Sequence, residues 1–168
     1  MQEHETRRLR LIPFSLELRK AALADKDRLA ELLGVRVPAS WPGPDLAEAL
    51  PFFISEVEKH PTLPIWDGLI IHKEDATLIG DMGFKGGPDA HGRLEIGYSI
   101  IPEYRNQGYA TEMACHLIGW AWQQPGVTSV VAECLDNNLG SIRVLEKVGM
   151  RRLGAEGSML RWEVRRTP

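Results

Sequence analysis

Residues 101–112 read IPEYRNQGYATE and join an apolar run typical of a strand to an apolar run typical of a helix. The first N–H groups of a helix have no partners within the helix, and the helix dipole adds partial positive charge there. Gly108 removes the side chain where an anion would approach this backbone, and Ala110 is nearly as small. Arg105 and Asn106 add donors. The stretch therefore predicts a phosphate cradle, with a tight turn that needs only Gly108 as an equal alternative.

The common nucleotide-binding patterns do not surround Gly108. A Walker loop needs glycine followed by Lys and Ser or Thr, and a dinucleotide-binding turn needs GxGxxG with an acidic residue about twenty positions later. Neither pattern occurs at this junction. A nucleotide-binding protein that uses the same helix N-terminus stays open as another class of function.

Outward from this junction, apolar periodicity and turn residues predict a mixed sheet. The segment from 64 to 101 contains three strands in series, which favours an antiparallel meander. The strand, helix and strand between 93 and 134 favour one parallel pair. We expect strands at 8–14, 64–72, 77–84, 93–101, 128–134, 150–153 and 158–164, and helices at 16–33 (with a break near Asp25), 45–59, 111–122 and 139–148. The predicted fold class is α+β (α/β), with about seven strands and flanking helices.

Length and composition predict one compact domain over residues 1–168. Hydrophobic residues make up 43% of the chain and charged residues 26%, as in ordinary globular proteins. The net charge of -3 argues against nucleic acid as a partner. The basic residues near the N-terminus, Arg7, Arg8 and Arg10, are expected to be solvated.

The cysteines and the N-terminal segment argue against a metal protein, a disulfide-bonded protein and a membrane protein. Cys115 and Cys134 lie far apart without CxxC spacing, which argues against a metal site and a disulfide framework. The charged N-terminal segment is not followed by a long apolar run, so neither a signal peptide nor a membrane helix is expected. We therefore expect a cytoplasmic protein without a metal.

Residues 105–110, RNQGYA, resemble the Arg/Gln-x-x-Gly-x-Gly/Ala motif of the GNAT acyl-CoA N-acyltransferases. Residues 94–113 and DNNLGSIRVLEKVGM at 136–150 are similar to the family as well. The first strand and the element order resemble the RimJ/RimL-type protein N-terminal acetyltransferases over nearly the whole chain. The resemblance implies the GNAT fold, with a splayed parallel strand pair. It also implies acetyl transfer from acetyl-CoA to a primary amine, by direct attack in a ternary complex.

The resemblance assigns cofactor-binding roles to two segments and one side chain. The loop amides would hold the CoA pyrophosphate, and the preceding strand end would splay at a bulge and pair with pantetheine. Asn138 would bond the pantetheine arm, or act only as a helix N-cap. The cofactor-binding candidates are Ser99, Ile100, Ile101, Arg105, Asn106, Gln107, Gly108, Tyr109, Ala110, Thr111 and Asn138.

Glu95 and Ser141 are the catalytic candidates. Strand alternation places Glu95 on one face with Gly97 and Ser99, and many relatives carry a Glu at this place. It would take the proton of the amine, although a salt bridge to a neighbouring strand is an equal alternative. Many family members have a Tyr acid where this chain has Leu145. Ser141 is then the nearest hydroxyl by motif position, and a weaker acid than a phenol.

The acceptor amine is open between a protein N-terminus and a small molecule. Trp41 and Trp66 are expected to pack in the core, with the wall of an acceptor pocket as the alternative. No membrane partner is expected, and a monomer and a homodimer both fit. A non-catalytic acyl-CoA-binding module, which Leu145 would suit, is the alternative to an enzyme.

Overall fold

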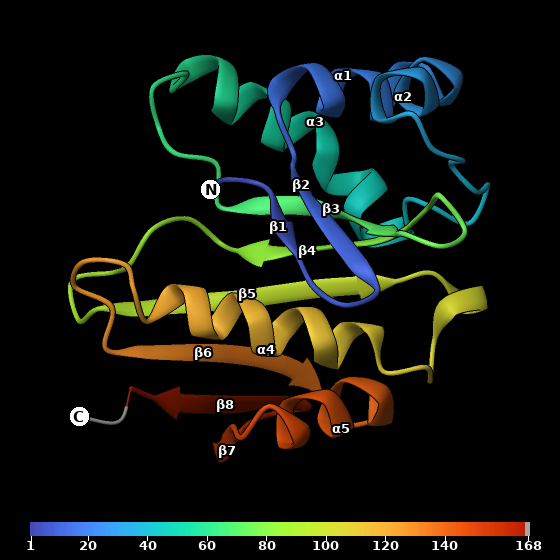
Figure 1. Cartoon of the computed structure of the whole chain (residues 1–168). Helices are drawn as coiled ribbons and strands as arrows, with labels where there is room; N and C mark the ends of the chain where they lie inside the picture. The colour runs from blue at the N-terminus through green and yellow to red at the C-terminus, as the bar shows by residue number, and fades with distance from the viewer. Residues whose placement is uncertain (167–168) are drawn as a thin grey trace.

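A mixed eight-stranded sheet organises residues 1–166, the part of the chain that the computed structural model describes (Figure 1). The strand order is β1-β2-β3-β4-β5-β6-β8-β7, and only β5 and β6 run parallel. The strands are β1 (His4–Glu5), β2 (Leu9–Pro13), β3 (Asp67–His72), β4 (Thr77–Phe84), β5 (Arg93–Ile100), β6 (Ser129–Leu135), β7 (Arg151–Glu156) and β8 (Met159–Arg165). The predicted α+β fold and its parallel pair are confirmed, and the additional strand is the two-residue β1.

Five α-helices and one short 3-10 helix complete this part of the chain: α1 (Leu16–Ala24), α2 (Lys26–Leu33), α3 (Pro44–Lys59), η1 (Pro102–Tyr104), α4 (Tyr109–Ala121) and α5 (Leu139–Lys147). The predicted break near Asp25 is confirmed, because the Asp25 carboxylate caps α2 by accepting from the Arg28 amide. α4 begins two residues before the predicted start, so Tyr109 and Ala110 are its first residues. None of the helices within residues 1–166 is long and apolar enough to cross a membrane.

The helices α1, α2 and α3 gather beside β2–β4, whereas α4 and α5 lie beside β5–β8 (Figure 1). Side chains directly opposite each other in an antiparallel pair share a face of the sheet. Phe84 of β4 and Ile96 of β5 form such a pair, and Phe84 stacks on Trp120 of α4. Their face therefore packs against α4. Asp81 opposite Ser99 and Gly83 opposite Gly97 belong to the other face, toward α1 and α3.

The parallel pair separates after three residues. Arg93–Glu95 pair with Ser129–Val131, and β5 then continues to Ile100 with only β4 beside it. The register between β4 and β5 is unbroken along this stretch. The predicted splay is present, but it begins just after Glu95 and comes from the end of pairing rather than from the predicted bulge.

Candidate functional site

The loop between β5 and α4 presents a run of free backbone donors. The amides of residues 106–111 donate to no protein acceptor within residues 1–166; the first helical amide with a partner is that of Glu112, which donates to the Gly108 carbonyl at 3.0 Å. No side chain caps the helix. Consecutive free N–H groups at a helix N-terminus attract anions, because the dipole adds positive charge at the same place.

Two residues in left-handed conformation shape this run. Asn106 has φ +60° and Gly108 has φ +82°. Left-handed residues within a turn direct successive N–H groups into one concavity, which is an arrangement that binds anions. A Cβ at Gly108 would lie 3.4 Å from Arg8 Nη2, which is an ordinary van der Waals contact, so the left-handed backbone is what favours glycine here.

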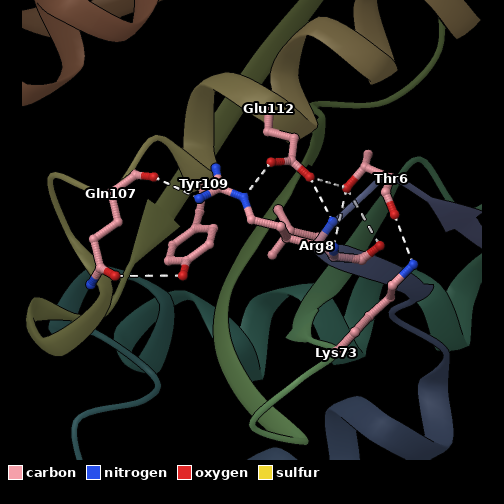
Figure 2. Close-up of polar contacts among 7 residues, drawn as sticks. Thr6, Arg8, Lys73, Gln107, Tyr109 and Glu112 are labelled. Carbon is pink, nitrogen blue, oxygen red and sulfur yellow. Dashed lines mark hydrogen bonds and ion pairs between the residues drawn. The ribbon is translucent and has the colours of Figure 1, made fainter.

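Arg8, at the entry to β2, fixes the loop from its inner side (Figure 2). Its Nη1 donates to the Gln107 carbonyl at 3.0 Å, and its Nε donates to Glu112 Oε2 at 2.7 Å. The guanidinium also lies over the Tyr109 ring, 4.3 Å from the centroid. The side chain is 31% exposed, so the expectation of a solvated Arg8 is wrong. Its carboxylate partner, 104 positions away, holds it against the loop.

Glu112 joins α4 to the N-terminal segment. Its Oε1 accepts from Thr6 Oγ1 at 2.7 Å and from the Arg8 amide at 2.9 Å. Burial raises the pKa of Glu112, but the bonds from Thr6 and Arg8 outweigh it and hold the pKa below its ordinary value. The ion pair with Arg8 is therefore formed at neutral pH. Thr6 in turn accepts, at its carbonyl, a bond from Lys73 (Figure 2).

The hydroxyl of Ser141 lies across the splay from β5. Tyr98 of β5 and Ser141 of α5 bring their hydroxyl oxygens to 2.8 Å. Burial raises the pKa of Tyr98 to about 12, so the phenol keeps its proton over the working range of pH. Asn138 caps α5 by accepting from the Ser141 amide at 3.0 Å. Leu145 is 1% exposed, in the core. The phenol near Ser141 therefore comes from β5 instead of from position 145.

At the end of β5 the backbone groups are already occupied. The Ile100 carbonyl accepts from Arg105 Nε at 2.8 Å, and the Ile101 amide donates to the Ile79 carbonyl at 2.9 Å. The side chains of both isoleucines are buried. The part of β5 without a partner on the β6 side is Ile96–Ile100, so the edge available to an extended ligand begins before the predicted Ser99.

A cavity of about 480 Å³ lies on the other face of the sheet, between α3 and β4. Gly83 and Gly97, opposite each other on β4 and β5, contribute no side chains to its floor. Its lining is mostly apolar and includes Phe14, Leu46, Phe53 and Trp66. A pocket of this size with a few polar groups can hold a small organic molecule or the end of a peptide. Trp66 lines this cavity and also packs against Phe84 and Trp120, so core packing is confirmed for this side chain and its role in an acceptor pocket stays a prediction.

Asp81 is a carboxylate in the lining of this cavity. Its Oδ2 accepts from Ser99 Oγ at 2.8 Å and from Trp41 Nε1 at 3.1 Å. Burial raises the pKa of Asp81 to about 6, against the effect of these two bonds, and nearby Asp67 raises it further. Trp41 is fully buried, as core packing requires, and also orients this carboxylate.

Glu95 is already paired. Its carboxylate forms an ion pair with Lys85, which also lines the cavity. This contact is the salt bridge to a neighbouring strand that was the alternative to a catalytic role. Glu95 lies two pairs along β5 from Ser99, on the same face of the sheet. The structure thus brings Ser99 and Asp81 together and holds Glu95 apart with its own cation.

Asp81 and Arg8 are the two residues that sequence reasoning missed. Asp81 sits in an otherwise apolar strand, TLIGDMGF, and a lone carboxylate there was the available signal. Arg8 was grouped with the other basic residues near the N-terminus. Within residues 1–166, no group of three or more His, Cys, Asp or Glu side chains could hold a metal ion.

Comparison with known proteins places these features in a family. Residues 15–151 match the family model described as "Acetyltransferase (GNAT) domain". An uncharacterized N-acetyltransferase of Bacillus subtilis, YjdG, is 36% identical over 146 residues, which cover 86% of this chain and 87% of that protein.

Solved structures agree on the fold. A ribosomal-protein-S5-alanine acetyltransferase from Vibrio fischeri has a TM-score of 0.66 at 15% identity, covering 97% of this chain and 96% of its own. The microcin C7 self immunity acetyltransferase MccE, solved in complex with acetyl-CoA and AMP, has a TM-score of 0.65 at 15% identity, covering 95% and 93%. At such identities the likeness extends to the fold alone.

Proposed function

Because this chain belongs to the GNAT acetyltransferase family, we propose that it transfers an acetyl group from acetyl-CoA to a primary amine. The two substrates meet in a ternary complex, and the amine attacks the thioester directly. Residues 1–168 act as one catalytic domain. The acceptor is a protein N-terminal amine or a small-molecule amine.

The observation that carries this proposal is the run of free amides at residues 106–111. A pyrophosphate has several anionic oxygens to accept from successive N–H groups, and the helix dipole favours it further. Arg8 leaves the amide side of the loop free, since it bonds the carbonyl of Gln107 from the inner side. Arg105, Asn106 and the residues through Thr111 therefore form the proposed pyrophosphate site.

Pantetheine would extend from this loop along the unpaired edge of β5, from Ile96 toward Ile100. A free strand edge offers N–H and C=O groups to an extended amide-bearing chain. Asn138 keeps its side-chain amide nitrogen for the same ligand, because its oxygen is used in the cap. The thiolate that leaves after attack would take a proton from Ser141, whose hydroxyl is backed by the Tyr98 phenol.

The acceptor would enter the cavity on the opposite face of the sheet. Its apolar and aromatic lining suits the carbon skeleton of an amine, and its polar lining includes Asp81, which accepts a hydrogen bond from Ser99. The two proposed substrate sites thus approach each other across β5.

Two measurements test this function. Calorimetry with acetyl-CoA, ATP and NAD should give binding of acetyl-CoA in preference to either nucleotide, and a preference for ATP or NAD would contradict the proposal. A screen of amines and N-terminal peptides should then release free CoA with at least one acceptor. A protein that binds acetyl-CoA and stays silent across the screen would instead be an acyl-CoA-binding module.

A further inference from the structure

One carboxylate lies between the two proposed substrate sites. Asp81 lines the cavity on the α3 side of the sheet, and its Cα partner on β5 is Ser99. Ser99 belongs to the stretch of β5 that has no partner on the β6 side. Asp81 is therefore within reach of a molecule in the cavity, and it lies one strand away from the edge of β5 proposed to hold the acetyl donor.

The two oxygens of Asp81 have different surroundings. Both protein hydrogen bonds, from Ser99 Oγ and from Trp41 Nε1, go to Oδ2. Oδ1 accepts no side-chain bond within residues 1–166, and it is not among the fully buried polar atoms that lack a partner there. One oxygen is thus held in place while the other stays accessible, which is the arrangement of an oriented proton acceptor.

Among the side chains of residues 1–166, no cation forms an ion pair with Asp81. Arg19 of α1 bonds Asp67 of β3 at 2.6 Å, and Lys85 pairs with Glu95. Burial raises the pKa of Asp81 to about 6, so the carboxylate is mostly ionised at pH 7 and can still accept a proton. The other titratable groups that line the cavity are Glu56 of α3, which pairs with Lys59, and His60, which caps the C-terminus of α3.

Resting on the proposed function, we infer that Asp81 is the base of the reaction and that its Oδ1 takes the proton of the acceptor ammonium. The freed nitrogen lone pair forms the N–C bond to the thioester carbonyl, and the C–S electron pair leaves with the sulfur. The nitrogen gives its second proton to Ser141 as the Ser141 hydroxyl protonates the departing sulfur, and Asp81 returns its proton to water. One amine and one acetyl-CoA give one amide, one CoA thiol and one released proton.

The test is the pH profile of kcat/KM, with acetyl-CoA and the amine or peptide that the wild type acetylates fastest in the screen. An enzyme with its own base accepts the ammonium form, so log(kcat/KM) should be level between about pH 6 and the pKa of the amine, and should fall with unit slope below about pH 6. Asp81→Asn must wait for the neutral amine, so its log(kcat/KM) should rise with unit slope up to the pKa of the amine. At pH 7 the variant should be slower by about 100-fold or more, the range of general base catalysis, with the affinity for acetyl-CoA unchanged.

Trp41→Phe is the matched control, because it removes one hydrogen bond and keeps the carboxylate. It should retain the level region, with the acid edge moved to higher pH, since the lost bond holds the pKa of Asp81 down. The wild-type profile alone decides the matter if Asp81→Asn does not fold, because a profile without a level region overturns the assignment.

Three results would count against Asp81 as the base. The first is a level region of log(kcat/KM) that persists in Asp81→Asn. The second is a level region that is lost in Glu95→Gln and kept in Asp81→Asn. The third is a loss of acetyl-CoA affinity in Asp81→Asn that accounts for the whole effect. Failure of the proposed function looks different, because the wild type would then bind acetyl-CoA and acetylate no amine.

Discussion

Replacing Asp81 by Asn should stabilise the protein more at pH 8 than at pH 4, because a buried carboxylate costs stability when it is ionised. The pKa of Asp81 is raised from 3.8 to about 6 in the folded protein. For an acid, a raised pKa in the folded state means that folding favours the protonated form. The group therefore costs no stability below about pH 4. The cost grows as pH rises from about 4 to about 6, where the unfolded chain ionises and the folded protein does not, and it stays constant above about pH 6.

The size of the effect follows from the same two values. A difference between 3.8 and about 6 corresponds to about 3 kcal/mol of unfolding free energy. Urea unfolding of the wild type and of Asp81→Asn should be compared from pH 4 to pH 8. The stability of the variant minus that of the wild type should increase by about 3 kcal/mol over this range, mostly between pH 4 and 6. Other titrating carboxylates cancel in this difference, because both proteins carry them.

Only the change with pH is diagnostic, since Asn can accept the bonds from Ser99 and Trp41 with a different strength. A difference in stability that stays constant from pH 4 to pH 8 would refute the reasoning. A constant difference would mean that Asp81 is solvated in the folded protein and that its pKa is not raised. The assignment of Asp81 as the base would then lose the raised pKa as an argument.

Three further substitutions test the loop and its supports. Gly108→Ala should lower the unfolding free energy by about 1 kcal/mol, because residue 108 has a left-handed backbone, and should weaken acetyl-CoA binding. Gly119→Ala, on the exposed side of α4, should instead raise the unfolding free energy by about 0.5–1 kcal/mol. Equal melting curves of the two variants would contradict this prediction. Arg8→Ala should weaken acetyl-CoA binding about tenfold in calorimetry, about 1.4 kcal/mol for a lost charge-assisted bond, and Glu112→Gln should act in the same direction; full affinity in both variants would show that the loop holds its own shape. Asn138→Ala should lower the unfolding free energy by about 1 kcal/mol through loss of the α5 cap, while Asn138→Ser should retain most of it.

Much of the fold follows from local patterns in the chain. The largely apolar segment at 77–84 is β4 with unchanged bounds, and the cap at Asn138 begins α5 where a capping residue precedes an apolar run. The prediction for β3 was less accurate, because Pro64–Trp66 continue its apolar pattern while forming the wall of the cavity. The two-residue β1 has no pattern to recognise, since only its pairing with β2 defines it.

In the candidate site as well, features formed by neighbours in sequence could be predicted and contacts between distant residues could not. The loop around Gly108 is formed by neighbours in sequence, so its free amides could be expected from the motif, and their binding of a pyrophosphate stays a prediction. Asp81 depends on Trp41 and Ser99, which lie 40 and 18 positions away, and Arg8 depends on a carboxylate 104 positions away. Local patterns carry no information on such pairings. They also could not show that Glu95 meets Lys85 across the turn between β4 and β5.

Transfer of the acetyl group itself is the most direct test of the account. Acetyl-CoA labelled with carbon-14 in the acetyl group should be incubated with the protein and the amine and peptide panel, and the products separated from CoA. The account predicts label in an amide of at least one amine, with one free CoA for each acetylated acceptor, and no label transfer by Asp81→Asn at pH 7 above about one hundredth of the wild-type rate. Label that stays on CoA, or appears only as acetate, with every acceptor would contradict the claim that this protein is an N-acetyltransferase.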